Sequence, residues 1–162
     1  MARIPIDWIT VGETLHGHCF ICELQAGTPG FEHDVIGEYD GAIVFLSKYP
    51  SLFGHVLVAP TAHREAVTED FDLDTYLRLQ SVVYRVAEAL RVEVATERMY
   101  ILSLGSQQGN SHVHWHIVPL PPGVPIEEQQ FKALDRNDMV DVSRAETLAL
   151  LEGLRRRLVR PE

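Results

Sequence analysis

The chain has 162 residues, 46% of them hydrophobic, and a formal net charge of −9 at pH 7. This size and this apolar content are typical of one folded domain and exclude a chain that is disordered throughout. A diffuse negative charge repels nucleic-acid phosphates, no apolar run is long enough to cross a membrane, and the first residues lack a secretion signal. We therefore expect a cytoplasmic protein whose partners include no nucleic acid and no membrane.

Residues 1–17 are predicted to form an irregular lead-in to Cys19 and Cys22, the two cysteines of the chain. Their Cys-x-x-Cys spacing occurs both in redox pairs and in metal sites. A redox pair needs a helix that begins at the first cysteine, and Gly27 and Pro29 come too soon for a long helix. We therefore favour a turn that directs both thiolates at one metal ion, which is half of a tetrahedral zinc site and needs two further ligands.

The next segment predicts an antiparallel meander of three strands, because strand-like runs flank a strong turn signal. The dipeptide Asp40-Gly41 is typical of a tight hairpin, since both central positions of that turn need a positive φ. We place the strands at residues 34–39, 42–46 and 55–59.

Residues 72–90 contain the clearest helical pattern in the chain. Apolar residues recur there at three- and four-residue steps, and acidic residues at the start suit the helix dipole. We expect the apolar face to pack in the core. Its members are Leu73, Tyr76, Leu77, Val83, Val86, Ala87 and Leu90.

A strand at residues 98–104 is predicted to pair antiparallel with the strand that follows, because only a short polar loop separates them. Pro119 should end that second strand, since proline cannot donate to a ladder. Further on, Ser143 and Glu146 have the spacing of a capping box and predict a helix that extends to about Val159. We expect this helix to pack on the domain; a dimer contact and a lid over the site are the alternatives.

Three histidines, His112, His114 and His116, alternate with β-branched and aromatic residues in the stretch 111–118. This alternation favours a strand whose three imidazoles share one face, while the apolar residues face the core. Two functions suit such a face. The imidazoles could bind a metal, or they could act as acid, base or nucleophile near neutral pH.

Three segments in this order resemble the histidine-triad (HIT) superfamily of nucleotide hydrolases and transferases. The stretch 112–118 looks like the signature of the superfamily, and residues 50–63 are similar to its Pro…Gly-His-x-Leu-Val-x-Pro-x-x-His segment. The stretch 19–22 resembles the opening segment of the zinc-containing branch. The match runs from about His18 to Pro121.

The resemblance implies an α+β fold with an antiparallel sheet of about five strands, one main helix and a C-terminal helix. We expect a single domain over residues 1–162, with a core at about 18–121 and a C-terminal extension at 122–162. The resemblance also implies a homodimer.

The zinc-containing branch binds its metal through the two cysteines, the histidine that ends the Pro-x-x-His segment and the first histidine of the triad. In this chain the implied ligands are Cys19, Cys22, His63 and His112. A Cys2His2 set leaves no open position, so the Zn²⁺ ion would be structural. A reduced thiol pair without metal is the alternative, and His18 is a competing ligand.

By the same resemblance, His114 is the nucleophile that forms a nucleotidyl-imidazole, which water then releases. His116 would donate to the phosphate oxygens or to the leaving atom, where pre-positioned donors stabilise developing charge. Three polar residues of the preceding loop, Ser106, Gln107 and Asn110, are predicted phosphate contacts.

The base and the ribose are expected to lie against the earlier strands. Phe20, Phe45 and Leu46 are the predicted apolar contacts of the base. Ser47 stands where relatives often have an Asn or Asp that holds the ribose, and its side chain is shorter. The usual Gln-x-Val-x lead into the triad is also replaced here, by residues 108–111, so the resemblance does not fix the leaving group.

We therefore predict an enzyme that hydrolyses a nucleoside monophosphate linked to another group, such as a phosphoramidate or a dinucleoside polyphosphate. A nucleotidyltransferase or phosphorylase with the same chemistry is one alternative. A zinc-stabilised nucleotide-binding protein with little turnover is a second. A third is a plain metal-binding module that uses His112, His114 and His116 together.

Overall fold

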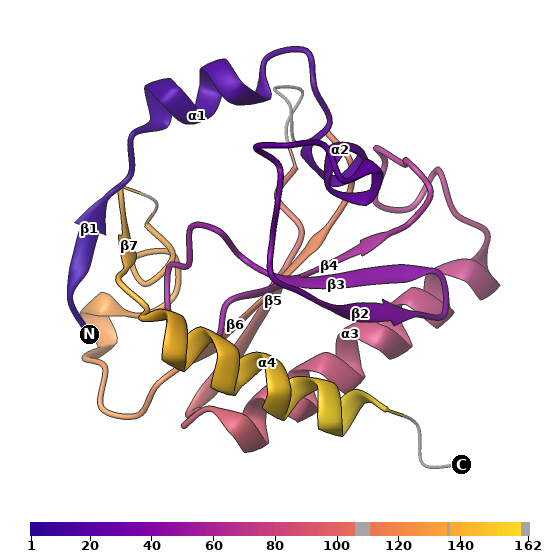
Figure 1. Cartoon of the computed structure of the whole chain (residues 1–162). Coiled ribbons are helices and arrows are strands. Elements are labelled where there is room, and N and C mark those ends of the chain that lie inside the picture. Colours follow the sequence, from indigo (N-terminus) through magenta and orange to yellow (C-terminus); the bar gives the residue numbers. More distant parts are fainter. Residues whose placement is uncertain (106–110, 136, 160–162) are drawn as a thin grey trace.

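The computed structural model describes residues 1–105, 111–135 and 137–159. Five strands form one antiparallel sheet in the order β2-β3-β4-β6-β5, and two short strands, β1 and β7, form a second sheet (Figure 1). In chain order the elements are β1 (Arg3–Pro5), α1 (Trp8–Leu15), α2 (Phe20–Ala26), β2 (Val35–Tyr39), β3 (Ala42–Leu46), β4 (Val56–Pro60), α3 (Leu73–Glu93), β5 (Arg98–Leu102), β6 (Trp115–Leu120), the short 3-10 helix η1 (Ile126–Glu128), β7 (Asp138–Val140) and α4 (Arg144–Leu158). Among these described elements, no helix is both long and apolar enough for a membrane span.

The predicted α+β fold with a five-stranded antiparallel sheet is confirmed. Strands β2, β3 and β4 form the expected meander, and the hairpin residues Asp40 and Gly41 have φ values of 50° and 81°. The predicted antiparallel pairing of β5 with β6 is also present. Positive φ at both turn positions matches the twist of the flanking strands, which explains why the Asp40-Gly41 dipeptide alone was enough to predict the hairpin.

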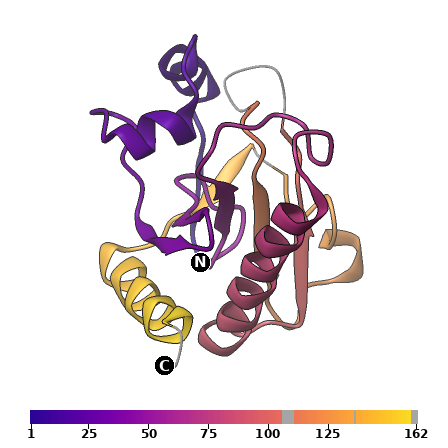
Figure 2. The same ribbon diagram turned by 90° about the vertical axis from the view of Figure 1, so that its right-hand side faces the viewer.

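The two faces of the large sheet have different partners. Helices α3 and α4 cover one face, where they pack on Val44, Val58 and Ile117 (Figure 2). Helix α2 covers part of the other face through the fully buried Ile21. Strand pairing places Phe45, Leu57 and His116 opposite one another, so His116 lies on the α2 face. This alternation brings the histidine strand to the less covered side of the sheet.

The two predicted helices are present with small shifts. Helix α3 begins after its N-cap Asp72, but Leu73 and Leu77 are 71% and 54% exposed, so its buried face begins later, at Leu79. Helix α4 begins with the expected capping box, and Leu154 is fully buried against the common core. The C-terminal helix therefore packs on the domain, as predicted.

The predicted irregular lead-in is wrong. Residues 3–5 form β1, which pairs antiparallel with β7 far along the chain, and Arg3 Nε donates to Asp138 Oδ1 at 2.6 Å. Helix α1 follows, with Asp7 as its N-cap, and it has no buried residue. A strand of three residues is too short for its alternation to be recognised, and helix α1 has only eight residues, one of them the weak helix former Gly12.

The predicted turn at Cys19 is also wrong, because Cys19 is the N-cap of helix α2 and its Sγ accepts from the backbone N–H of Cys22. The helix has only seven residues and ends at Gly27, which has a φ of 70°. Gly27 therefore caps the C-terminus of a short helix, and its presence does not exclude a helix before it.

The histidine strand is shorter at its start and longer at its end than predicted. Strand β6 begins at Trp115, so His112 and His114 lie in the segment that leads into it. It continues through Pro119 to Leu120, although Pro119 was expected to end it. Strand β4 pairs with β6 only at residues 115–117, so Pro119 lies beyond that ladder, where a missing N–H is tolerated.

Candidate functional site

Two cysteines and two histidines converge between α2 and the start of the histidine segment. The ligand atoms of Cys19, Cys22, His63 and His112 all lie within 4.8 Å of one another. Cys19 Sγ lies 3.4 Å from His112 Nδ1, and Cys22 Sγ lies 3.4 Å from His63 Nδ1 and 3.7 Å from His112 Nδ1. In tetrahedral zinc sites, sulfur and nitrogen ligands lie about 3.5 Å apart. The donor set and its spacing therefore fit a zinc ion.

Hydrogen bonds orient both imidazoles toward this cluster. His112 Nε2 donates to the carbonyl oxygen of Pro60 at 2.9 Å, and His63 Nε2 lies 3.1 Å from Glu65 Oε1. Because each Nε2 carries the proton, each Nδ1 presents its lone pair to the cluster. Ser111 Oγ also donates to Glu65, which holds the carboxylate in place. Such outer contacts fix the orientation of metal ligands and raise their basicity.

The protonation of the cluster is set mainly by burial. Burial lowers the pKa of His112 to about 4 and raises the pKa of the Cys22 thiol to about 11. Zinc binding at neutral pH therefore releases the thiol proton, while His112 is already neutral. The competing ligand, His18, is not in the cluster, and its Nδ1 contacts Glu23 Oε1 at 2.8 Å.

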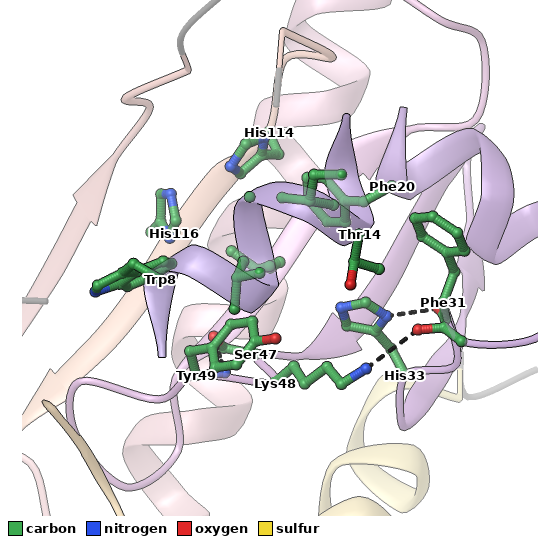
Figure 3. A pocket seen from close by; sticks show the side chains of 15 residues that line it. Trp8, Thr14, Phe20, Phe31, His33, Ser47, Lys48, Tyr49, His114 and His116 are labelled. Carbon is green, nitrogen blue, oxygen red and sulfur yellow. Dashed lines mark hydrogen bonds between the residues drawn. The ribbon is translucent and has the colours of Figure 1, made fainter. Parts of the chain in front are cut away.

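The three histidines of the triad divide between two sites. His112 faces the thiols, whereas His114 and His116 line a cavity of about 370 Å³ (Figure 3). Among the described residues, the one cluster of potential metal ligands does not contain His114 or His116. A module in which all three triad histidines share one metal is therefore wrong.

His114 is held so that its Nε2 atom carries the lone pair of the ring. The residue is 3% exposed, and its Nδ1 lies 2.7 Å from the backbone carbonyl oxygen of His112. A carbonyl can only accept, so Nδ1 carries the proton and Nε2 carries the lone pair. The arrangement also links the two sites, because His112, a candidate metal ligand, supplies the carbonyl that orients His114.

His116 belongs to a chain of hydrogen bonds that begins at the backbone. The N–H of Ser51 donates to His55 Nδ1 at 3.3 Å, and His55 Nε2 lies 2.9 Å from His116 Nδ1. Since His55 Nδ1 accepts, its proton is on Nε2, and His116 Nδ1 must accept that proton's hydrogen bond. The remaining proton of neutral His116 is therefore on Nε2. The ring centroids of His114 and His116 are 4.8 Å apart, so this donor lies beside the imidazole of His114.

Only some of the predicted base and ribose contacts line the cavity. Phe20 and Ser47 line it. Phe45 is fully buried beneath it and packs against Phe20 with centroids 6.3 Å apart, so it supports a cavity wall. Leu46 packs on the helix-covered face, because successive residues of a strand point to opposite sides, and its prediction as a base contact is wrong.

Three predicted phosphate contacts lie outside the described residues. They are Ser106, Gln107 and Asn110.

Several residues in the cavity wall, or behind it as His55 is, were not predicted as site residues. His55 was part of a quoted motif, but its role depends on the pairing of Leu57 with His116, which places His55 diagonally opposite His116 on the same face. His33 lines the cavity with no local motif around it. Helix α1 forms another wall through Trp8 and neighbouring residues, from the segment that was predicted to be irregular.

Comparison with known proteins agrees with this geometry. A model of the HIT domain family matches residues 29–122, which include the triad but not the cysteines. An uncharacterized HIT-like protein of Saccharolobus solfataricus is 30% identical over 105 residues, which are 62% of this chain and 73% of that protein. One from Mycoplasma genitalium is 31% identical over 107 residues, 62% of this chain and 72% of that protein.

Solved structures share the fold. A hypothetical histidine triad nucleotide-binding protein from Sulfolobus tokodaii has a TM-score of 0.65 and 25% identity, with 86% of this chain and 91% of that chain covered. A zinc-bound histidine triad family protein from Mycobacterium smegmatis has a TM-score of 0.66 and 22% identity, with 85% and 94% covered.

Proposed function

Since the chain belongs to the HIT domain family, whose members are typically nucleotide hydrolases or transferases, we propose that it hydrolyses nucleoside monophosphates linked to another group. His114 would carry the nucleotidyl group between two steps. The observation that supports this most is the pairing of a fixed Nε2 lone pair on His114 with a fixed Nε2–H donor on His116, both facing one cavity.

In the first step, Nε2 of His114 forms a bond to the phosphorus atom, and the bond from phosphorus to the leaving group breaks. The leaving group departs with the bonding electron pair and takes a proton from water, while the Nε2–H of His116 donates a hydrogen bond to the oxygens on which negative charge develops. The imidazole of His114 becomes cationic, and the carbonyl oxygen of His112 stabilises that charge through Nδ1–H.

In the second step, a water oxygen bonds to phosphorus and the bond from phosphorus to Nε2 of His114 breaks. Its electron pair returns to His114, the released proton of the water passes to the solvent, and the Nε2–H of His116 again donates to the phosphoryl oxygens. His114 thereby returns to its neutral form, and His116 keeps its Nε2 proton throughout.

The proposal also assigns structural zinc to Cys19, Cys22, His63 and His112. When bound, the metal would join helix α2 to the segment before β6 and hold the His112 carbonyl in place. With no open ligand position, it would take no part in the chemistry.

Partners and location stay predictions. A nucleotide is the proposed small-molecule partner, and the homodimer and the cytoplasmic location expected from the sequence are not needed by the mechanism. His114, His116 and His55 all come from one chain, so a single copy contains this part of the machinery.

The proposal is tested by incubating the protein with an adenosine phosphoramidate and with a diadenosine polyphosphate, each with and without inorganic phosphate. We expect AMP from the parent, and a rate at least about 10³-fold lower in His114→Ala with its zinc content unchanged. His16→Ala is the control, because His16 is exposed and does not line the cavity. ADP formed only with phosphate would identify a phosphorylase. Nucleotide binding without turnover would contradict the hydrolase and support the alternative of a zinc-stabilised nucleotide-binding protein.

A further inference from the structure

The cavity has a second histidine region at the end away from the triad. Phe20 lies between the two, with its ring centroid 5.5 Å from that of His114 and 5.8 Å from that of His33. Figure 3 shows His114 and His116 at one end of the cavity and His33 with Lys48 at the other. A nucleoside monophosphate has its phosphorus and its base at opposite ends. With phosphorus at His114, the base therefore extends toward His33.

The ring of His33 is fixed as a hydrogen-bond acceptor. Its Nδ1 lies 2.9 Å from the backbone carbonyl oxygen of Phe31, so Nδ1 carries the proton and Nε2 carries the lone pair. Burial lowers the pKa of His33 below its ordinary value of 6.5, which keeps the ring neutral at physiological pH. Figure 3 shows the second nitrogen turned away from Phe31 and toward the cavity.

Aromatic neighbours hold this orientation. His33 packs edge to face on Phe45, with centroids 5.2 Å apart and an interplanar angle of 79°. Phe45 is fully buried, so the imidazole rests on a rigid support. A fixed acceptor in a largely apolar wall discriminates strongly between ligands, because a ligand without a matching donor leaves it unpaired.

We propose that His33 recognises the base: its Nε2 accepts a hydrogen bond from an exocyclic amino group, as on adenine. A purine without that amino group would leave the acceptor unpaired, and a carbonyl oxygen in the same position would repel it. This inference rests on the proposed function in one respect, that phosphorus lies at His114.

The test compares two substrates that differ only in the amino group, an adenosine phosphoramidate and the corresponding purine riboside phosphoramidate. In the parent, kcat/KM for the adenosine compound should be higher by about 10- to 100-fold. His33→Phe keeps the ring and removes the acceptor, and its preference should fall to about one- to twofold. Lys48→Met is the matched control at the same end of the cavity, and it should change both substrates alike. An unchanged preference in His33→Phe, or no preference in the parent, would overturn the inference.

A binding measurement separates this inference from the proposed function. Calorimetric titration of His114→Ala with AMP and with purine riboside monophosphate needs no turnover. The inference predicts that AMP binds more tightly by a similar factor, and that adding His33→Phe removes the difference. Equal binding of the two ligands would overturn the role of His33 and leave the hydrolase proposal intact, whereas no binding of either would overturn both.

Discussion

The Nε2 atom of His55 lies 2.9 Å from the Nδ1 atom of His116, and the backbone N–H of Ser51 fixes the proton of His55 on that Nε2. The tautomer of His116 is thus determined by a main-chain amide two hydrogen bonds away. His116 meets the substrate with a donor only because of this chain.

Replacing His55 should therefore slow the chemical step without weakening substrate binding. His55 does not line the cavity, so KM should stay near the parent value in His55→Phe while kcat falls on the order of 10²-fold. His55→Gln restores an N–H donor and should recover part of the loss. Steady-state kinetics on both variants check this, with zinc content as the control for folding. A His55→Phe variant with the parent kcat would show that His116 needs no such orientation.

The proposed zinc site predicts which variant should lose the metal. Cys22→Ser should lower the zinc content well below one ion per chain, because oxygen is a poorer ligand than thiolate for this set. His18→Ala is the control, since His18 contacts Glu23 and not the cluster. Metal analysis after extensive dialysis measures both. Equal zinc content in Cys22→Ser and the parent would contradict the proposed site. A lower zinc content in His18→Ala would show that His18 is a ligand.

Glu65 should tune zinc affinity without binding the metal. Its carboxylate accepts from His63 and Ser111, and these hydrogen bonds hold its pKa below the ordinary value. In Glu65→Gln the oxygen can still accept but the charge is lost, so we expect zinc affinity to fall about 10-fold. Competition with a chromophoric chelator measures the change. Unaltered affinity would mean that His63 is oriented by other contacts.

The lowered pKa of His33 predicts a pH dependence of stability. In the folded protein burial disfavours the charged ring, whereas the unfolded chain binds a proton near pH 6.5. Stability contributed by this group is therefore fully present above about pH 6.5 and is lost as the pH falls toward the lower folded pKa. The drop in unfolding free energy between about pH 7.5 and about pH 5.5 should be smaller in His33→Phe than in the parent. Urea unfolding of both proteins at the two pH values measures it, with His16→Phe at an exposed position as the control. The same drop in both proteins would contradict a neutral, buried His33.

The large sheet and the two long helices could be predicted because their signals are local. The Asp40-Gly41 turn, the apolar face of α3 and the capping box of α4 each need only neighbouring residues to act. Strand β1 could not be predicted in the same way, since its partner β7 is contributed by residues more than a hundred positions later. Helix α1 follows that strand and buries no residue of its own.

In the candidate site, too, some residues could be predicted from sequence motifs, and others depend on contacts that only the fold creates. The four proposed zinc ligands followed from motif resemblance, and their side chains converge as expected. His33 could not be found from sequence, because its role depends on the bond to the Phe31 carbonyl and on the packing of Phe45 beneath it. Leu46 was assigned to the wrong face, although strand alternation with Phe45 already excluded it.

The proposed mechanism requires a transient bond between His114 and the nucleotide, and trapping that bond tests it most directly. The protein is mixed with an adenosine phosphoramidate, quenched in alkaline denaturant within the first turnover and analysed by intact and peptide mass spectrometry. We predict a mass increase of one nucleotidyl group on the peptide that contains His114, and none in His114→Ala. A nucleotidyl group on another residue, or parent-like turnover by His114→Ala, would contradict the mechanism.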